Sequence, residues 1–342
     1  LTKPVDVPKL ISLLEQSKTE SNQASPPSPA PADSTAAAEF SVKEDFIRFW
    51  GVRGSIPTPG PSTVHYGGNT SCVELRLGGQ LVILDAGSGL LAFGDQLLRE
   101  FPGQALNMTL LLTHTHWDHI QGFPFFAPAY FPKNQLRLIG YQGAKQGLDK
   151  TLIVQMESPF FPISLRQMPG NLRFDEQEEL DFTIGPIKCT ACFVNHPDVT
   201  MGYRLEAQGI SVAYVSDHES YIRMRRHTKN APEKAAEISD YAKSEEEMLE
   251  EFLRDVDVLI MDSQYTADEY ATKVGWGHSC FEDTVMTAIK SGVKRLYLFH
   301  HDPRRHDDDL TRILGEAREL VAREGSDLIV DCAREGVRVD LS

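Results

Sequence analysis

The sequence predicts an α/β (α+β) protein in which two β-sheets pack face to face and helices cover both outer faces, an αββα sandwich. Short apolar runs of strand length recur between residues 46 and 300, and segments with helical spacing separate them at intervals. Such a mixture of strands and interspersed helices favours sheets layered with helices. The chain has 342 residues, 41% of them hydrophobic, which is enough to bury a large core.

The first half of the chain is expected to supply one set of strands with a covering helix. Strands are predicted, in order, at 46–50, 72–77, 80–84 and 108–113. A helix is predicted near 90–100, and Gly-rich loops follow the first strand. Residues 141–186 are expected to hold one helix and irregular cover for the functional site.

The second half is expected to supply the remaining strands and most of the helices. Strands are predicted at 187–194, 201–206, 210–215, 257–262 and 295–300. Helices are predicted near 244–254, 281–291 and 308–323. Alternation of the two element types along this half fits the same sandwich.

Residues 21–42 are expected to form a linker ahead of the main domain, which we place at 43–342. The core of this linker, 23–38, consists mainly of Pro, Ala and Ser. Such a composition cannot bury enough apolar surface to order itself, and its prolines keep it extended. The linker predicts that the residues before it form a separate element.

That preceding element, 1–20, contains Lys3-Pro4 followed by a run with helical apolar spacing at 7–14. The arrangement resembles the end of a response-regulator receiver domain, where a Lys-Pro pair closes the last strand and a helix follows. The resemblance implies an upstream receiver domain and a cognate histidine kinase as partners. It also implies that 43–342 is the output domain of a two-component protein cut within its receiver.

The net charge indicates which classes of partner are expected, and the cysteine content indicates the compartment. The net charge of −15 is unusual for a protein that binds long nucleic acid, because phosphate neutralisation requires a basic face. The one basic cluster, Arg223 to Lys229, is interpreted as a solvent-exposed loop. The five scattered cysteines indicate a reducing cytoplasm, and we expect Cys189 and Cys192 to pack in the core. We expect neither a membrane nor nucleic acid as partner, and the sequence permits a homodimer.

The motif from Thr113 to His119 carries the strongest functional signal. His114, His116, Asp118 and His119 follow directly after the apolar run of a predicted strand. Side chains alternate along a strand, so the first two imidazoles project to the same side. If the chain then turns into a helix, Asp118 and His119 can face the same point from another direction. Imidazole and carboxylate ligands in this mixture favour a hydrolytic metal centre.

This pattern resembles the metal-binding signature of the metallo-β-lactamase fold. Four further motifs of that family occur in the expected order, each at the end of a predicted strand; they contain Asp85, His196, Asp217 and His300. The resemblance implies two metal ions, with Asp217 bridging them. One ion would be held by His114, His116, His196 and Asp217, and the other by Asp118, His119, Asp217 and His300. Asp85 is expected to orient a ligating histidine, and His218 and His301 to point away.

Residues late in the chain distinguish branches of the family. The motif Gly277-His278-Ser279 follows Asp262, with His278 16 residues after Asp262 (262 to 278). His300 follows His278 by 22 residues (278 to 300). This layout resembles the RNase Z and phosphodiesterase branch, in which an acidic residue pairs with such a histidine. Motifs across residues 45–325, including Gly275-Trp276-Gly277-His278-Ser279, resemble proteins grouped with the phosphoribosyl cyclic phosphate phosphodiesterase.

These resemblances imply a binuclear metal-dependent phosphodiesterase acting on small, often cyclic phosphodiesters, and a signalling context favours a cyclic nucleotide. Zinc is the expected metal, and manganese and iron also suit the ligands. Asp118, His278 and Asp262 are expected to take part in catalysis, with His278 protonating the departing oxygen. The alternatives are an RNase Z-like endoribonuclease and a signalling module that only binds a ligand. A lactonase or β-lactamase is disfavoured because neither needs the pair formed by Asp262 and His278.

Overall fold

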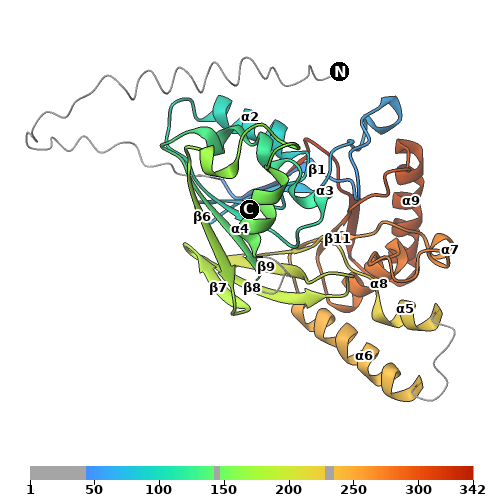
Figure 1. Cartoon of the computed structure of the whole chain (residues 1–342). Coiled ribbons are helices and arrows are strands. Elements are labelled where there is room, and N and C mark those ends of the chain that lie inside the picture. The colour runs from blue at the N-terminus through green and yellow to red at the C-terminus, as the bar shows by residue number, and fades with distance from the viewer. Residues whose placement is uncertain (1–43, 142–146, 228–234, 342) are drawn as a thin grey trace, which may run out of the picture. The chain divides into compact units, whose positions relative to one another are not determined.

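The computed structural model describes residues 44–141, 147–227 and 235–341, which belong to a unit running from Phe40 to Ser342. The predicted receiver remnant at 1–20 and the linker at 21–42 lie outside the described residues. Two seven-stranded sheets face each other, and helices lie on their outer sides (Figure 1). The αββα sandwich predicted from the sequence is confirmed.

The first sheet combines antiparallel and parallel pairing. Its strands, in spatial order, are β14 (Arg338–Asp340), β1 (Phe46–Gly51), β2 (Cys72–Leu77), β3 (Gln80–Leu84), β4 (Asn107–Leu111), β5 (Gln135–Tyr141) and β6 (Asn171–Gln177). The pairs from β14 to β3 are antiparallel, and those from β3 to β6 are parallel. Strands β1, β3 and β4 therefore run in the same direction and end at the same edge.

The second sheet repeats this mixture. Its strands, in spatial order, are β13 (Ile329–Cys332), β12 (Arg295–Phe299), β11 (Val258–Asp262), β10 (Ile210–Val215), β9 (Thr200–Ala207), β8 (Ile187–Val194) and β7 (Asp181–Ile184). Strands β10 to β13 are parallel, whereas β7 to β10 pair in antiparallel fashion. Strands β8, β10, β11 and β12 therefore share one direction.

Helices cover the outer face of each sheet. In chain order they are α2 (Leu90–Glu100), α3 (Trp117–Ile120), α4 (Leu148–Gln155), α5 (Tyr221–His227), α6 (Ala235–Phe252), α7 (Ala267–Tyr270), α8 (Phe281–Lys290) and α9 (Asp307–Arg323). Short 3-10 helices lie at Pro61–Thr63, Phe123–Phe125, Ala127–Tyr130 and Leu165–Gln167. Helices α2 and α4 contact the first sheet, and α6, α8 and α9 contact the second. No helix among the described residues is long and apolar enough to span a membrane.

Strand alternation divides the interior into two apolar layers. On β12, Tyr297 and Phe299 point into the core between the sheets, while Leu296 and Leu298 pack beneath α8 and α9. Cys189 and Cys192, three residues apart on β8, likewise pack on opposite faces, as expected for core positions. Both cysteines carry free thiols and are not joined in a disulfide.

The predicted irregular cover at 141–186 is only partly right. It contains α4, but it also contains the edge strands β6 and β7. Neither of the two strands has a run of buried residues: none of β6 is buried, and only Ile184 of β7 is. Edge strands of this kind leave little apolar periodicity in the sequence, which explains why they were not predicted.

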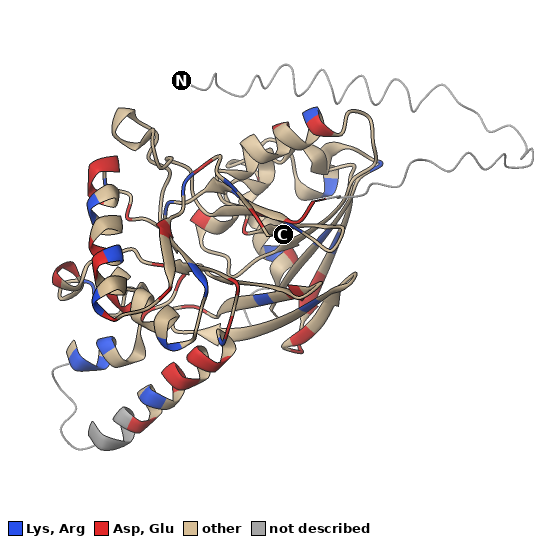
Figure 2. Cartoon of the chain, turned by 180° about the vertical axis from the view of Figure 1, so that it is seen from behind, with Lys and Arg blue, Asp and Glu red and all other residues tan. Residues whose placement is uncertain are grey.

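The described part of the basic cluster, Arg223 to His227, belongs to helix α5 rather than to a loop, and Lys229 lies outside the described residues. Arg223 makes an ion pair with Asp283 of α8, so part of this positive charge fastens α5 to the domain. Figure 2 shows basic α5 beside α6, which carries many Asp and Glu side chains. The cluster therefore lies next to an acidic helix and does not extend into a basic face.

Candidate metal centre

The candidate ligands meet at one edge of the sandwich because their strands run in the same direction. His114 and His116 follow β4, His196 follows β8, Asp217 follows β10, and His300 follows β12. The carboxyl ends of parallel strands are common sites for ligands in α/β sheets. After β4 the chain turns into α3, as expected, and this turn brings Asp118 and His119 to the same edge.

Three histidines and one oxygen of Asp217 form what we call the open cluster. His116 Nδ1 lies 2.9 Å from His114 Nε2 and 3.1 Å from His196 Nε2. Asp217 Oδ2 lies 3.8 Å from His114 Nε2 and 3.9 Å from His196 Nε2. These atoms converge on one point from three strand ends, an arrangement that suits a tetrahedral divalent ion.

Asp118, His119 and His300 form the buried cluster with the other oxygen of Asp217. Asp118 Oδ2 lies 3.1 Å from His300 Nε2 and 3.3 Å from His119 Nε2. Asp217 Oδ1 lies 3.2 Å from His119 Nε2 and 3.4 Å from His300 Nε2. The two oxygens of Asp217 thus face different clusters, which is the geometry required of a bridging carboxylate.

The open cluster has the protonation states that divalent cations need. In the buried cluster, burial alone would lower the pKa of His119, but Asp217, Asp118 and Asp85 outweigh burial and raise that pKa well above its usual value, so a bound cation would have to displace the proton. His119 Nε2 and Asp217 Oδ1 are buried and have no hydrogen-bond partner, an arrangement that is costly unless another group binds them. Burial lowers the pKa of His196 to about 4 and that of His114 well below its usual value, so both imidazoles are neutral. Burial would raise the pKa of Asp217, but the neighbouring imidazoles outweigh it and lower that pKa. Neutral imidazoles and ionised carboxylates are the forms that bind metal.

Asp85 holds the buried cluster from outside. Its Oδ2 lies 2.8 Å from His119 Nδ1 and accepts a hydrogen bond from the Tyr214 hydroxyl at 2.9 Å. Its Oδ1 accepts the Thr113 amide at 2.8 Å. Asp85 adopts a positive φ of 59° just after β3, a strained conformation that turns its carboxylate beneath His119. This contact agrees with the orienting role expected for Asp85.

Two further partners of the buried cluster were not predicted. Gln264 Oε1 lies 2.9 Å from His300 Nδ1, and the Ser55 amide donates to Asp118 Oδ2 at 2.6 Å. Gln264 follows Asp262 by only two residues, a proximity that the sequence does display. Gly54, beside Ser55, packs directly on the His300 ring: a Cβ there would lie 2.3 Å from His300 Cε1. The loop after β1 is therefore fitted to this histidine.

His278 lies beside both clusters and outside the two ligand sets defined above, although its ring also lies within metal-binding reach of His196 with Asp217 and of Asp262 with His300. Its Nδ1 is 2.7 Å from Asp262 Oδ2, and its ring stacks on that of His300 at 4.9 Å between centroids. Burial alone would lower its pKa, but Asp262, Asp217 and Asp118 outweigh burial and raise it to about 9. The contact with Asp262 fixes the orientation of the ring, so its other nitrogen can face a bound substrate and donate a proton.

Glu219 organises the loop that carries His278, and sequence reasoning missed it. This buried carboxylate accepts the Gly275 amide at 2.8 Å, the Gly277 amide at 2.9 Å and the Tyr270 hydroxyl. The carbonyl of Gly277 in turn accepts a hydrogen bond from His196 Nδ1 at 2.9 Å. Because Glu219 lies two residues after Asp217, it links the bridging carboxylate to both histidines. An acidic residue so close to a ligand was the available signal.

His218 and His301 point away from the clusters, as expected. The Asn195 amide donates to His218 Nδ1 at 3.2 Å, and His301 Nε2 lies 3.0 Å from the Ala333 carbonyl. Among the described residues neither histidine belongs to a group able to hold a metal ion. Their ring nitrogens instead join neighbouring strand ends.

The centre opens to solvent at the open cluster. The side chain of His116 is 41% exposed, and its Nε2 lies 3.1 Å from the exposed Asp198 carboxylate. Every other ligand side chain is buried. A substrate can therefore approach past His116, and His278 lies close by, with its Nδ1 3.8 Å from the Asp217 oxygen that faces the open cluster.

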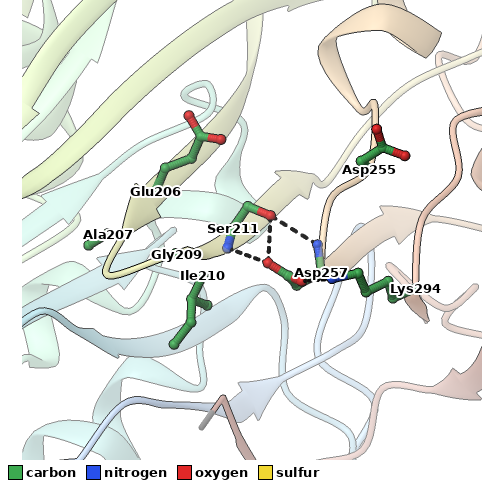
Figure 3. A pocket seen from close by; sticks show the side chains of 8 residues that line it. All are labelled: Glu206, Ala207, Gly209, Ile210, Ser211, Asp255, Asp257 and Lys294. Carbon is green, nitrogen blue, oxygen red and sulfur yellow. Dashed lines mark hydrogen bonds and ion pairs between the residues drawn. The ribbon is translucent and has the colours of Figure 1, made fainter.

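A separate hollow of about 350 Å³ lies away from this centre (Figure 3). It is found where the β9–β10 turn meets the residues before β11. Within it, Asp257 accepts hydrogen bonds from the amide and hydroxyl of Ser211, each at 2.8 Å, and pairs with Lys294. The polar groups of these residues are thus paired with one another. They lie at the starts of β10, β11 and β12, the edge opposite the ligands, so the hollow has a structural role.

Known proteins resemble this chain in sequence and in fold. Residues 81–301 match the model of the β-lactamase superfamily domain. Ribonuclease Z of Exiguobacterium sibiricum is 25% identical over 241 residues, which cover 62% of this chain and 76% of that protein. Unliganded yeast PDE1 superposes with a TM-score of 0.58 at 16% identity, over 87% of this chain and 99% of that one. A diphosphatase from the PhnP family superposes with a TM-score of 0.56 at 18% identity, over 87% and 98%.

The solved structures, both far below 25% identity, support the fold alone. The ribonuclease relative is in tension with the expectation that nucleic acid is not a partner, so that expectation is reconsidered below. Members of this fold family are hydrolases that bind divalent metals, and the two clusters offer suitable ligands. With well over half of its length matched by the domain model, the chain belongs to the β-lactamase superfamily.

Proposed function

We propose that this protein is a binuclear metal-dependent phosphodiesterase that hydrolyses small phosphodiesters. The observation that carries the proposal is the position of His278, which is hydrogen-bonded to Asp262 and stacked on the ring of the candidate ligand His300. Hydrolysis of a phosphodiester needs charge neutralisation at the phosphoryl oxygens, a nucleophile, and a proton for the departing alkoxide. The ribonuclease Z relative supports this class of reaction.

The proposed ligands are those of the open and buried clusters, with Asp217 shared. Divalent ions bound there would supply Lewis acidity and lower the pKa of a coordinated water. Zinc fits the histidine-rich open cluster, and manganese or iron fits the buried cluster with its additional carboxylate. Asp118 is held by the Ser55 amide, so its carboxylate keeps one orientation through the reaction.

In this proposal His278 gives its proton to the leaving oxygen. Asp262 accepts from Nδ1 and is itself held by the amides of His218 and Gln264, at 3.2 and 2.9 Å. The pair therefore presents the opposite nitrogen, Nε2, in a fixed direction. The carboxylate also stabilises the charged imidazole, so the acid is ready before the substrate binds.

The finer features of the proposal are the substrate and the biological context. We propose a cyclic phosphodiester, plausible substrates being cyclic nucleotides, and a cytoplasmic output domain at 43–342 controlled by a receiver and its histidine kinase. The sequence resemblances of 1–20 and of the Gly275–Ser279 motif support these features. A panel of cyclic nucleotides, assayed with and without residues 1–42, tests them.

A second candidate, an RNase Z-like endoribonuclease, is favoured by the 25% identical ribonuclease Z. Against it, the net charge is −15, and the basic helix α5 uses Arg223 in an internal ion pair. RNA affinity depends on basic surface that releases counterions. Cleavage of precursor tRNA at a rate exceeding that of small diesters would favour this second candidate. A purely ligand-binding module would hydrolyse neither.

The decisive experiment compares leaving groups in a His278→Ala variant. We expect both metals to remain bound and turnover of a cyclic nucleotide to fall by about 10²–10⁴-fold. The loss should be smaller for bis(p-nitrophenyl) phosphate, because p-nitrophenolate departs without a proton. Asp262→Ala should follow the same trend more weakly. Equal losses on both substrates would refute the acid role, and no loss on either would leave His278 structural.

A further inference from the structure

We propose that an apolar rim formed by Ile56, Trp117 and Trp276 binds the base of a nucleotide at the mouth of the metal centre. All three side chains are exposed, by 57%, 77% and 55% respectively. Each directly follows or precedes a residue that contacts a candidate ligand. The inference rests on the proposed phosphodiesterase function and specifies its substrate class as one with a planar aromatic group.

One flank of the rim lies beside Asp118. Trp117 stands between His116 and Asp118 in the chain, at the start of α3. Ile56 follows Ser55, whose amide donates to Asp118 Oδ2 at 2.6 Å. The two apolar side chains are therefore both anchored, through their backbone neighbours, at the same carboxylate. Since His116 is the exposed ligand, this flank adjoins the opening of the centre.

The other flank lies beside His196 and His278. Trp276 precedes Gly277, whose carbonyl lies 2.9 Å from His196 Nδ1. The ammonium of Lys273 sits 4.0 Å from the centroid of the Trp276 ring. The ammonium is attracted to one face of the indole by a cation–π interaction. The rest of the indole remains for another planar group. The loop that carries Trp276 is fixed by Glu219, so the ring has a stable base.

The position of the rim indicates what it binds. A phosphodiester bound at the two clusters must direct its substituents outward, past the flanks of the opening. The exposed tryptophans at these flanks provide stacking surfaces, which every nucleobase can use irrespective of sequence. The Lys273 ammonium adds positive charge beside Trp276, which favours an anionic ligand at this flank. A sugar phosphate without a base would leave both indoles in water.

A pair of ligands that differ only in the base tests this inference. Adenosine 5′-monophosphate and ribose 5-phosphate should be titrated calorimetrically into the metal-loaded protein. Base stacking contributes about 1–3 kcal/mol per base, so we expect the nucleotide to bind about 5- to 150-fold more tightly. The nucleotide should also quench tryptophan fluorescence. Trp50 is the remaining one of the three tryptophans. It is stacked on Phe93 and donates a hydrogen bond to Glu74, so its fluorescence should not respond.

Variants locate the effect. Trp276→Ala and Trp117→Ala should each weaken binding of adenosine 5′-monophosphate while leaving that of ribose 5-phosphate unchanged. Ile329→Ala serves as the matched control, because Ile329 is 56% exposed but lies at the start of β13, the edge opposite the centre. This control should bind both ligands as the parent protein does.

The outcomes separate this inference from the proposed function. Equal affinities for the two ligands, or binding of neither, would overturn base recognition even if bis(p-nitrophenyl) phosphate is hydrolysed. Failure to hydrolyse any phosphodiester would instead overturn the proposed function. A change of oligomeric state in the tryptophan variants, with ligand affinities unaltered, would show that the rim is a contact between two copies of the chain and would also overturn the inference.

Discussion

The open and buried clusters contain similar ligands but are supported in different ways. In the buried cluster each histidine has a buried partner, Asp85 for His119 and Gln264 for His300. In the open cluster, His116 is 41% exposed and its partner Asp198 is 59% exposed. Hydrogen bonds within a low-dielectric interior hold a ligand more firmly than those shared with water. One half of the centre is therefore rigidly preformed, and the other is accessible.

This difference suggests a division of labour. A buried and rigid cluster can retain its ion through many reaction cycles, whereas an exposed cluster leaves room for a substrate to approach. The strain observed in the backbone agrees with this assignment: Asp85 and His300, both at the buried cluster, have positive φ values of 59° and 58°. Such conformations persist only where the surrounding structure determines them.

The strongest test of the comparison removes the residue common to both clusters. Because the oxygens of Asp217 face different clusters, Asp217→Ala should release both metal ions and reduce hydrolysis to the background rate. Metal analysis of the purified variant measures the loss, and circular dichroism checks the fold. Asp217→Asn keeps one oxygen ligand and should retain one ion. Retention of both ions by Asp217→Ala would contradict a bridging role.

A smaller and selective effect is expected from Asp85→Asn. The substitution preserves the shape of a buried side chain but removes the charge that faces His119 Nδ1. Outer partners of metal-bound histidines typically contribute 10- to 100-fold in affinity, so one ion should bind about that much more weakly. Chelator competition on the metal-loaded protein measures it. Equal weakening of both ions would show that the clusters are not independently supported.

Much of this centre could be predicted because His114 to His119 form one compact motif, and because the resemblance to the metallo-β-lactamase family implied the remaining ligands. Strands β2, β3, β8 and β10 were predicted at the observed limits, so Asp85, His196 and Asp217 were correctly placed at strand ends. The turn into α3 was stated as the condition under which Asp118 and His119 face the same point as the two histidines before them, and the structure contains this turn. The pairing of Asp262 with His278 appears in the structure as a 2.7 Å contact.

The residues that could not be predicted act through contacts between distant segments. Glu219 acts on loop amides more than 50 positions away, and Ser55 contributes only its backbone amide. Neither contact leaves a periodic signal in the sequence, because it depends on how strand ends meet in space. The exposed strand β6 escaped prediction for a different reason, since it has no buried residue.

The smallest effect is expected from Asp198→Asn, and it sharpens the comparison with Asp85→Asn. Asp198 contacts His116 Nε2 at 3.1 Å, the same kind of contact that Asp85 makes with His119. Asp198 is 59% exposed, however, and exposed ion pairs contribute only about 0–1 kcal/mol. We therefore expect metal affinity to fall by less than about fivefold, and less still at high salt, where screening weakens exposed pairs. Chelator competition at low and high salt measures the metal affinity of the two variants and its salt dependence side by side. A loss as large as that of Asp85→Asn would mean that solvent does not weaken support of the open cluster, and the distinction between a rigid and an accessible half would then be wrong.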